Sequence, residues 1–293
     1  MSGKLVFKLL LYLSLGFFVW YLVRLDYLVL SQVDPDLWLL FFSLLLLFGG
    51  FVLSSLSWWF ILRKHRIWIS ARRAIVSHGL YVFAKYIPGK LWVVVGRAAL
   101  VQAASGKPLR DLSFISLKEQ FIYLLLGLLL SIVPVYLLFG VGLYFGVVLL
   151  TILALALMLF SAAAHRLGLA LLEKLFKRKM DIPLLSLKDF SHTALAVLIY
   201  WVVWSAGFYL LLISMLGALS PITAFAFPLS VSYGVLALVM PGGIGVRESI
   251  ITGFLVSAAV PLDMAITISV VSRLWFVAGE LFFFLLALTL NRD

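Results

Sequence analysis

The sequence predicts an all-α polytopic membrane protein, with about six full transmembrane helices and two broken re-entrant helical hairpins in an inverted repeat. Three observations predict this fold class. The 293 residues are 65% hydrophobic and only 12% charged, against about 45–50% and about 25% in ordinary soluble domains. The apolar residues gather in runs of about 20, the length that one bilayer crossing needs. Two other apolar sections are interrupted by Pro-Gly sequences.

Six apolar runs are long enough to cross a bilayer without a break. They lie at about 5–23, 37–62, 112–139, 143–164, 191–216 and 264–290. Lysines accompany the first run, as in a signal peptide, but no small-residue cleavage site follows, so we expect an uncleaved helix. No sizeable soluble domain fits between the runs, which predicts a single integral membrane domain.

Two further apolar sections are broken in the middle. The first covers 74–104 around Pro88-Gly89, and the second covers 222–260 around Pro241-Gly242-Gly243. Proline removes a backbone donor and glycine adds conformational freedom, so a helix should end at each break. The arms are short for a crossing at about 1.5 Å per residue, which favours re-entrant hairpins. Broken backbone is tolerated at membrane depth only where protein or a wet cavity covers it.

The order of these elements repeats along the chain. Residues 1–142 read as helix, helix, broken hairpin, helix, and residues 143–293 read the same way. The two halves begin on opposite faces, so they would form an inverted repeat whose hairpins enter from opposite sides. In transporters of that architecture, the substrate site lies near the broken elements. The alternative is a chance likeness between apolar segments.

The net charge of +11 divides into two groups. Of the 23 lysines and arginines, 16 fall in the connections and termini predicted on one face, and only Arg24 falls on the other. This asymmetry predicts that the basic face is cytoplasmic, with both termini inside. The remaining six lie within the apolar sections, at Lys85, Lys90, Arg97, Lys118, Arg247 and Arg273.

Several classes of chemistry lack their residues in this sequence. The chain has no cysteine, which excludes disulfides and thiolate metal sites, and its four histidines show no metal-ligand spacing. It has no GxxxxGK[ST] phosphate loop, which argues against ATP-driven transport within the chain. We therefore expect no metal, no cofactor and no nucleic acid partner.

Charged residues inside a bilayer are costly and mark a functional site by default. Arg97 and Arg247 each follow a Pro-Gly break within ten residues, and their guanidinium groups suit phosphate or carboxylate. Glu119 can balance one of these arginines. Free N–H groups at the ends of broken helices also favour anions. These features predict a polar groove with a positive excess, suited to an anionic group.

Some of these charged residues also have a purely structural interpretation. Lys85 and Lys118 can extend their amines to the cytoplasmic interface, which is the interpretation we favour for them. Arg273 and Glu280 lie seven residues apart, on one face of the last predicted helix. They can form a structural ion pair as readily as a substrate site.

Four segments resemble a known family: YIPGKLWVVVGRAAL, LKEQFIYLL, VMPGGIGVRES and SRLW. They are similar to the membrane region of lysylphosphatidylglycerol synthases and to stand-alone flippase-like proteins, over nearly the whole chain. The resemblance implies a prokaryotic cell membrane and movement of a lipid between leaflets. Its substrates would be aminoacylated phospholipids or polyprenyl-phosphate-linked sugars. The soluble aminoacyl-transfer domain of the full-length synthases does not follow in this sequence, so we expect no enzyme activity.

The resemblance and the charge pattern together predict substrate-binding residues and no catalytic ones. They are Pro88, Gly89, Lys90, Arg97, Glu119, Pro241, Gly242, Gly243, Gly245, Arg247, Glu248, Arg273 and Glu280. The family often has a small or basic residue after the first Pro-Gly, here Lys90, and Glu-Arg in the third element. Gln120 departs from that second pattern.

The leading hypothesis is a lipid translocase that binds an anionic headgroup between the hairpins by Arg97 and Arg247, with help from Lys90. One alternative is a membrane transferase with a polyprenyl-phosphate donor. Asp34-Pro35-Asp36 is the nearest approach to the acidic pair that such an enzyme uses. The others are a non-transporting partner of a lipid-modifying enzyme and a solute transporter.

Overall fold

The computed structural model describes most of the chain. The described residues are 34–86, 91–164, 166, 167, 170, 187–238 and 240–292. Within these ranges the chain is helical and contains no strand, which confirms the all-α class. The predicted first crossing at 5–23 and the hairpin residues Pro88, Gly89 and Lys90 lie outside the described residues.

Five of the described helices are long and apolar enough to cross a membrane. They are α2 (Leu37–Lys64), α5 (Leu109–Phe139), α6 (Leu143–Phe160), α8 (Leu187–Leu216) and α11 (Leu262–Leu290). Each matches a predicted crossing, with ends shifted by a few residues. These helices make the chain a multi-pass membrane protein.

The shifted ends have a local cause. Helix α5 begins at Leu109, three residues before the predicted apolar run. The polar residues Arg110 and Asp111 form part of its first turn, and an apolar pattern does not include them. It ends at Gly140, which adopts a φ of 67°. Helix α2 begins after Asp36, whose carboxylate accepts hydrogen bonds from the N–H groups of Trp38 and Leu39 at 2.9 and 3.1 Å.

The first broken section contains helix α3 (Ala71–Gly79), the 3-10 turn η2 (Val82–Tyr86) and helix α4 (Leu91–Ser105). It begins three residues earlier than predicted because Ser70 caps α3 and accepts from the N–H of Arg73 at 3.2 Å. Helices α3 and α4 pack against each other. Both arms are shorter than a membrane crossing, as the break predicts.

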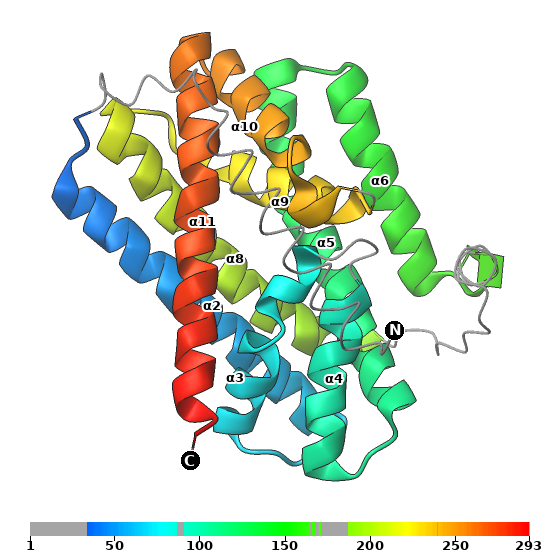
Figure 1. Ribbon diagram of the computed structural model, residues 1–293. Coiled ribbons are helices and arrows are strands. Elements are labelled where there is room, and N and C mark those ends of the chain that lie inside the picture. The colour runs from blue at the N-terminus through cyan, green and yellow to red at the C-terminus, as the bar shows by residue number, and fades with distance from the viewer. Residues whose placement is uncertain are drawn as a thin grey trace, which may run out of the picture.

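The second broken section has the same plan. It contains the 3-10 turn η3 (Pro221–Phe225), α9 (Ala226–Leu236), the 3-10 turn η4 (Pro241–Gly243) and α10 (Val246–Ser257). Helices α9 and α10 pack against each other. In Figure 1, α3 and α4 lie toward the C-terminal end of α11, whereas α9 and α10 lie toward its other end. The two broken sections therefore occupy opposite parts of the molecule.

Helices α2 and α8 form the most extensive helix pair. Ser43 Oγ donates to the carbonyl of Gly207 at 2.7 Å, and Trp204 Nε1 donates to the carbonyl of Leu47 at 3.2 Å. Ser43 is bonded to Gly207, and Leu47, further along α2, is bonded to Trp204, which comes earlier in α8. The two helices are therefore antiparallel. Both bonds join a side chain to a helix carbonyl in the core, which fixes how the helices are rotated against each other.

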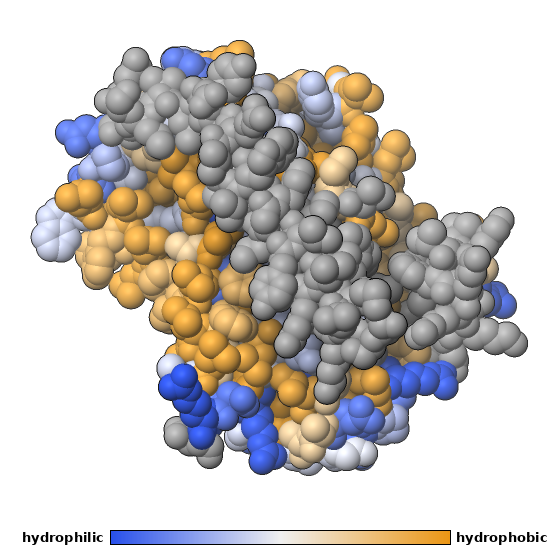
Figure 2. Space-filling model, in the orientation of Figure 1, coloured by the Kyte–Doolittle hydropathy of each residue, from blue (hydrophilic) through white to orange (hydrophobic). Residues whose placement is uncertain are grey.

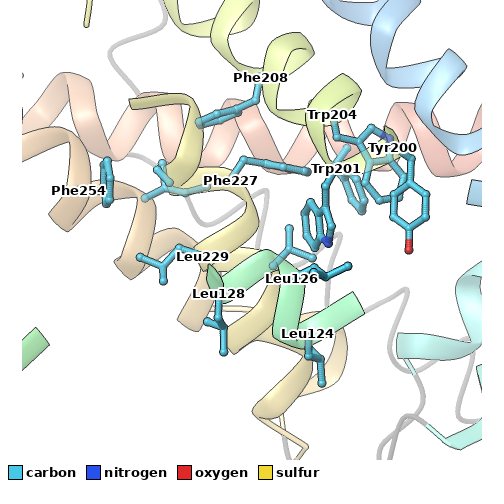
Figure 3. Close-up of a cluster of buried hydrophobic side chains, with 14 of the residues drawn as sticks. Leu124, Leu126, Leu128, Tyr200, Trp201, Trp204, Phe208, Phe227, Leu229 and Phe254 are labelled. Carbon is cyan, nitrogen blue, oxygen red and sulfur yellow. The ribbon is translucent and has the colours of Figure 1, made fainter. Parts of the chain in front are cut away.

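Aromatic side chains fill the centre of the bundle. Figure 3 shows Trp201, Trp204 and Phe208 of α8 converging with Phe227 of α9. The ring of Tyr123, from α5, stacks on Trp201 with centroids 4.5 Å apart. These rings come from α5, α8 and α9 and pack in one hydrophobic core, which joins the two halves of the chain.

The surface divides into an apolar belt and two polar ends. Figure 2 shows mostly hydrophobic residues, with hydrophilic ones gathered at the lower end. Arg72 Nε donates to the carbonyl of Leu290 at 2.8 Å, so the basic stretch after α2 lies beside the end of α11. Asp36 lies at the other end, where its N–H donates to the carbonyl of Ser214 at 2.8 Å.

Candidate functional site

The breaks of the two broken sections meet inside the bundle. Turn η2 of the first packs against turn η4 of the second. A Cβ atom at Gly242 would lie 2.5 Å from the ring of Tyr86, and one at Gly243 would lie 2.6 Å from the Cα of Gly234. Gly243 also has a φ of 73°. The contact of η4 with η2 therefore requires Gly242, and the contact of η4 with α9 requires Gly243. These two contacts give the Pro-Gly-Gly sequence a packing reason.

Helix α11 passes both breaks and presents one face to them. Arg273, Phe276 and Glu280 follow each other at spacings of three and four residues, so they share that face. Their exposed fractions are 2%, 4% and 0%. We call the contact of α11 with the two breaks the tip junction. It consists of Lys85, Tyr86, Gly242, Arg247, Glu248, Arg273, Phe276 and Glu280.

Glu280 joins α11 to the first broken section. One carboxylate oxygen forms an ion pair with Lys85, and the other accepts a hydrogen bond from the Tyr86 hydroxyl at 2.9 Å. The Lys85 side chain is 26% exposed, whereas the Glu280 side chain is fully buried. The expectation that Lys85 simply extends to the interface is wrong, because its amine turns inward to this buried carboxylate.

Arg273 joins α11 to the second broken section. Its Nη1 donates to the carbonyl of Gly242 at 2.9 Å, and its Nε lies 4.0 Å from a carboxylate oxygen of Glu248. The other oxygen of Glu248 accepts from the N–H of Gly245 at 2.8 Å, at the start of α10. Glu248 thus caps its own helix and faces an arginine of α11.

Arg247 differs from the other buried cations of the junction. It is 5% exposed, and its Nε has no hydrogen-bond partner. Its guanidinium carbon lies 4.7 Å from the ring centre of Phe276 and 5.7 Å from that of Phe227. Among the described residues, no carboxylate forms an ion pair with it. Two aromatic rings face its guanidinium group, and the nearby carboxylates of Glu248 and Glu280 form their ion pairs with other cations.

The described residues of the tip junction therefore contain more positive than negative charge. Three cations (Lys85, Arg247 and Arg273) face two carboxylates (Glu248 and Glu280). A buried charge without a counter-ion is costly unless a partner arrives. This excess would suit an anionic ligand, and the polar groove that could hold one stays a prediction.

Arg97 belongs to a separate cluster, which we call the Arg97 clamp. Its Nε donates to Ser116 Oγ at 2.5 Å, and its Nη2 donates to the Ser116 carbonyl at 2.9 Å. The same Nη2 lies 2.6 Å from Glu119, and the Trp58 ring centre is 4.3 Å from the guanidinium carbon. The expected balance of an arginine by Glu119 is thus found here, between α4 and α5.

The structure sorts the predicted site residues into two places. Gly242, Gly243, Gly245, Arg247, Glu248, Arg273 and Glu280 lie at or beside the tip junction, whereas Arg97 and Glu119 form the clamp. Pro241 begins η4 at the junction. Pro88, Gly89 and Lys90 lie outside the described residues.

Sequence reasoning missed four contributors to these clusters: Tyr86, Phe276, Ser116 and Trp58. Tyr86 directly precedes the Ile87-Pro88-Gly89 break, and Phe276 lies between Arg273 and Glu280 on the same helix face. Ser116 lies three residues before Glu119. Tyr86 and Phe276 had a usable signal in their positions, because each is one turn or less from a residue already chosen. Ser116 had the same spacing from Glu119, but its residue type added no signal, since buried serines are common in membrane helices.

The fold and the tip junction together define a polytopic membrane protein with a charged interior between two broken helical sections. The model of the lysylphosphatidylglycerol synthase TM region matches residues 5–278, so the chain belongs to that family. No curated protein and no solved structure gives a significant match. Membership relates the protein to lipid handling in a membrane.

The described residues offer no cluster of three or more His, Cys, Asp or Glu side chains that could bind a metal ion. The tip junction contains mainly lysine, arginine and aromatic side chains. Such side chains can bind an anion by charge and hydrogen bonds.

Proposed function

We propose that this protein is a lipid translocase, which moves a lipid with an anionic headgroup between the two leaflets. The observation that carries the proposal is Arg247, a buried guanidinium without an acidic partner among the described residues, at the place where two broken sections meet. The family match supports a lipid as the substrate. The lipid is a phospholipid, an aminoacylated phospholipid or a polyprenyl-phosphate-linked sugar.

In this proposal the headgroup binds at the tip junction while the acyl or prenyl tails stay in the bilayer. Moving a phosphate through hydrocarbon without partners costs many kcal/mol, on the order of tens by simple solvation arguments. Arg247 supplies the charge that offsets this cost, and its aromatic surroundings keep bulk water away. Arg97, fully engaged in its clamp, then supports the first hairpin rather than the headgroup.

The proposed transport cycle is alternating access. The two broken sections act as re-entrant hairpins of an inverted repeat, entering from opposite faces, and their separation opens the junction to one side at a time. The positions of α3–α4 and α9–α10 toward opposite ends of α11 support this arrangement (Figure 1). The basic stretch beside the end of α11 supports a cytoplasmic C-terminus in a prokaryotic inner membrane.

The proposal assigns no bond-making step to this chain and no cofactor. A lipid-synthesising enzyme would supply the lipid that is moved.

The test is translocation in vesicles reconstituted with the purified protein. Fluorescent phosphatidylglycerol in the inner leaflet becomes accessible to a membrane-impermeant quencher when it is moved. Arg247→Ala should lower the rate at least tenfold, because a charge-assisted contact to phosphate is worth about 1.5–3 kcal/mol. The matched control is Arg73→Ala, which removes an exposed arginine and should leave the rate unchanged. An unchanged rate in correctly folded Arg247→Ala would refute the assignment.

A further inference from the structure

The ring of Phe276 contacts two cationic side chains, which come from different broken sections. The Lys85 amine, from η2, lies 4.8 Å from the ring centre, and the Arg247 guanidinium carbon, from α10, lies 4.7 Å from it. The two distances, 4.8 Å and 4.7 Å, together place the amine and the guanidinium carbon at most 9.5 Å apart, around a single side chain of α11. A phosphate that bridges two N–H donors spans about 8 Å between the nitrogens, given hydrogen bonds of about 2.8 Å.

Lys85 and Glu280 are unequally accessible. Lys85 keeps 26% of its side chain exposed, whereas Glu280 is fully buried and also accepts from Tyr86. An incoming anion can therefore reach the lysine but not the carboxylate behind it. Lys85 has a long flexible chain and a compact charge, so it can turn to a new partner while Tyr86 keeps its hydrogen bond to Glu280.

We propose that Lys85 exchanges partners: it pairs with Glu280 when the site is empty and with the lipid phosphate when the site is loaded. The loaded phosphate then bridges Lys85 of the first broken section and Arg247 of the second. This inference rests on the proposed function and adds a second phosphate-binding residue to it. It also makes Glu280 a competitor of the substrate, whose removal strengthens binding.

The test is calorimetric titration of the purified protein with dioctanoyl phosphatidylglycerol, with farnesyl phosphate and with uncharged dioctanoylglycerol. Glu280→Gln should bind the phosphate lipids about tenfold more tightly, and Lys85→Gln about tenfold more weakly, since one charge-assisted contact is gained or lost. The matched control is Asp263→Asn, which removes the same charge from an exposed position at the other end of α11. It should change nothing.

The two lipid arms distinguish the source of the phosphate. Tighter binding of phosphatidylglycerol alone supports the exchange with a phospholipid, and tighter binding of farnesyl phosphate alone supports it with a prenyl phosphate. Equal or weaker binding of both by folded Glu280→Gln overturns it, because a merely structural ion pair gives that result. An equal gain in Asp263→Asn also overturns it, since the effect would then be net charge.

A second measurement covers the case in which Glu280→Gln does not fold. The chain has no cysteine, so Lys85→Cys carries the one thiol that a maleimide can label. Saturating phosphate lipid should slow this labelling several-fold, and dioctanoylglycerol should not. Labelling that is unaffected by either phosphate lipid overturns the exchange. The proposed function stands if the wild-type protein moves lipid in vesicles, even when the titration and labelling results contradict the partner exchange of Lys85. Both proposals are wrong if the wild-type protein neither binds nor moves lipid.

Discussion

Arg97 and Arg247 occupy similar places in the sequence but different environments in the fold. Each follows a Pro-Gly break within ten residues and lies in the helix that forms the second arm of a broken section. Arg97 contacts a serine, a glutamate and a tryptophan in the Arg97 clamp. Arg247 lies against Phe227 and Phe276 instead. A motif position therefore does not determine the environment of a side chain: neighbouring helices give Arg97 a buried carboxylate and give Arg247 two aromatic rings, and our proposal places the headgroup at Arg247 for that reason.

The two clusters also differ in what builds them. The clamp is formed mainly by side chains from α2, α4 and α5, with one hydrogen bond to the Ser116 carbonyl, whereas the tip junction combines a side-chain ion pair with contacts to the backbone of η4, such as the carbonyl of Gly242. We expect substitutions in the clamp to act mainly on stability. Four changes test this contrast, in order of decreasing effect on the free energy of unfolding.

The largest loss should come from Arg97→Gln. It leaves Glu119 buried, at 5% exposed, without its cation, and removing one partner of a buried ion pair costs about 3–5 kcal/mol. Unfolding by SDS in mixed micelles measures this loss. The double variant Arg97→Gln with Glu119→Gln should recover most of it, because neither group is then charged. No recovery in the double variant would mean that Arg97 acts through other contacts.

Gly243→Ala should come next, at about 2–4 kcal/mol. It adds a methyl group 2.6 Å from the Cα of Gly234 and forces a positive φ on alanine. Gly245→Ala is the matched control, with a φ of 83° but open space around its Cβ. It should lose only about 1–2 kcal/mol. The same unfolding assay compares them, and equal losses would show that the contact with Gly234 is not tight.

Ser116→Ala should cost about 1 kcal/mol. It removes the hydroxyl that accepts from Arg97 Nε, while the Ser116 carbonyl and Glu119 still hold the guanidinium. Its effect on lipid movement should be slight, since the clamp keeps its ion pair. A large fall in the rate of lipid movement in folded Ser116→Ala would instead indicate that Arg97 contacts the substrate. Arg97 and Arg247 would then have the same role.

Arg247→Met should change stability least, by about 1 kcal/mol or less. It gives up contacts with two aromatic rings, each worth about 0.5–1 kcal/mol, but it also removes a buried charge without an acidic partner among the described residues. Thermal unfolding in detergent measures this small change, while lipid movement in the same preparation should fall at least tenfold. A strongly destabilised Arg247→Met would show that this arginine is structural too.

Much of the fold was predictable because it depends on local composition. The long helices α2, α5, α6, α8 and α11 follow from apolar length, and both broken sections follow from proline and glycine chemistry. The candidate site was predicted less completely. Gly242, Arg247, Glu248, Arg273 and Glu280 were chosen from the sequence and lie together at the tip junction, but the assignment of Lys85 to the interface was wrong, and Tyr86 and Phe276 were missed. Partner choice among buried charges depends on contacts between helices far apart in sequence.

By itself, the sequence determined that this chain spans a membrane, that two of its apolar sections are broken, and which cations lie within the apolar sections. These properties follow from the transfer of apolar residues into lipid and from the backbone limits of proline and glycine. Only the tertiary structure decided that Glu280 pairs with Lys85, that Glu119 pairs with Arg97, and that Arg247 lies among aromatic rings. The physical reason is distance: attraction between charges depends on which helices meet, and no local pattern contains that information.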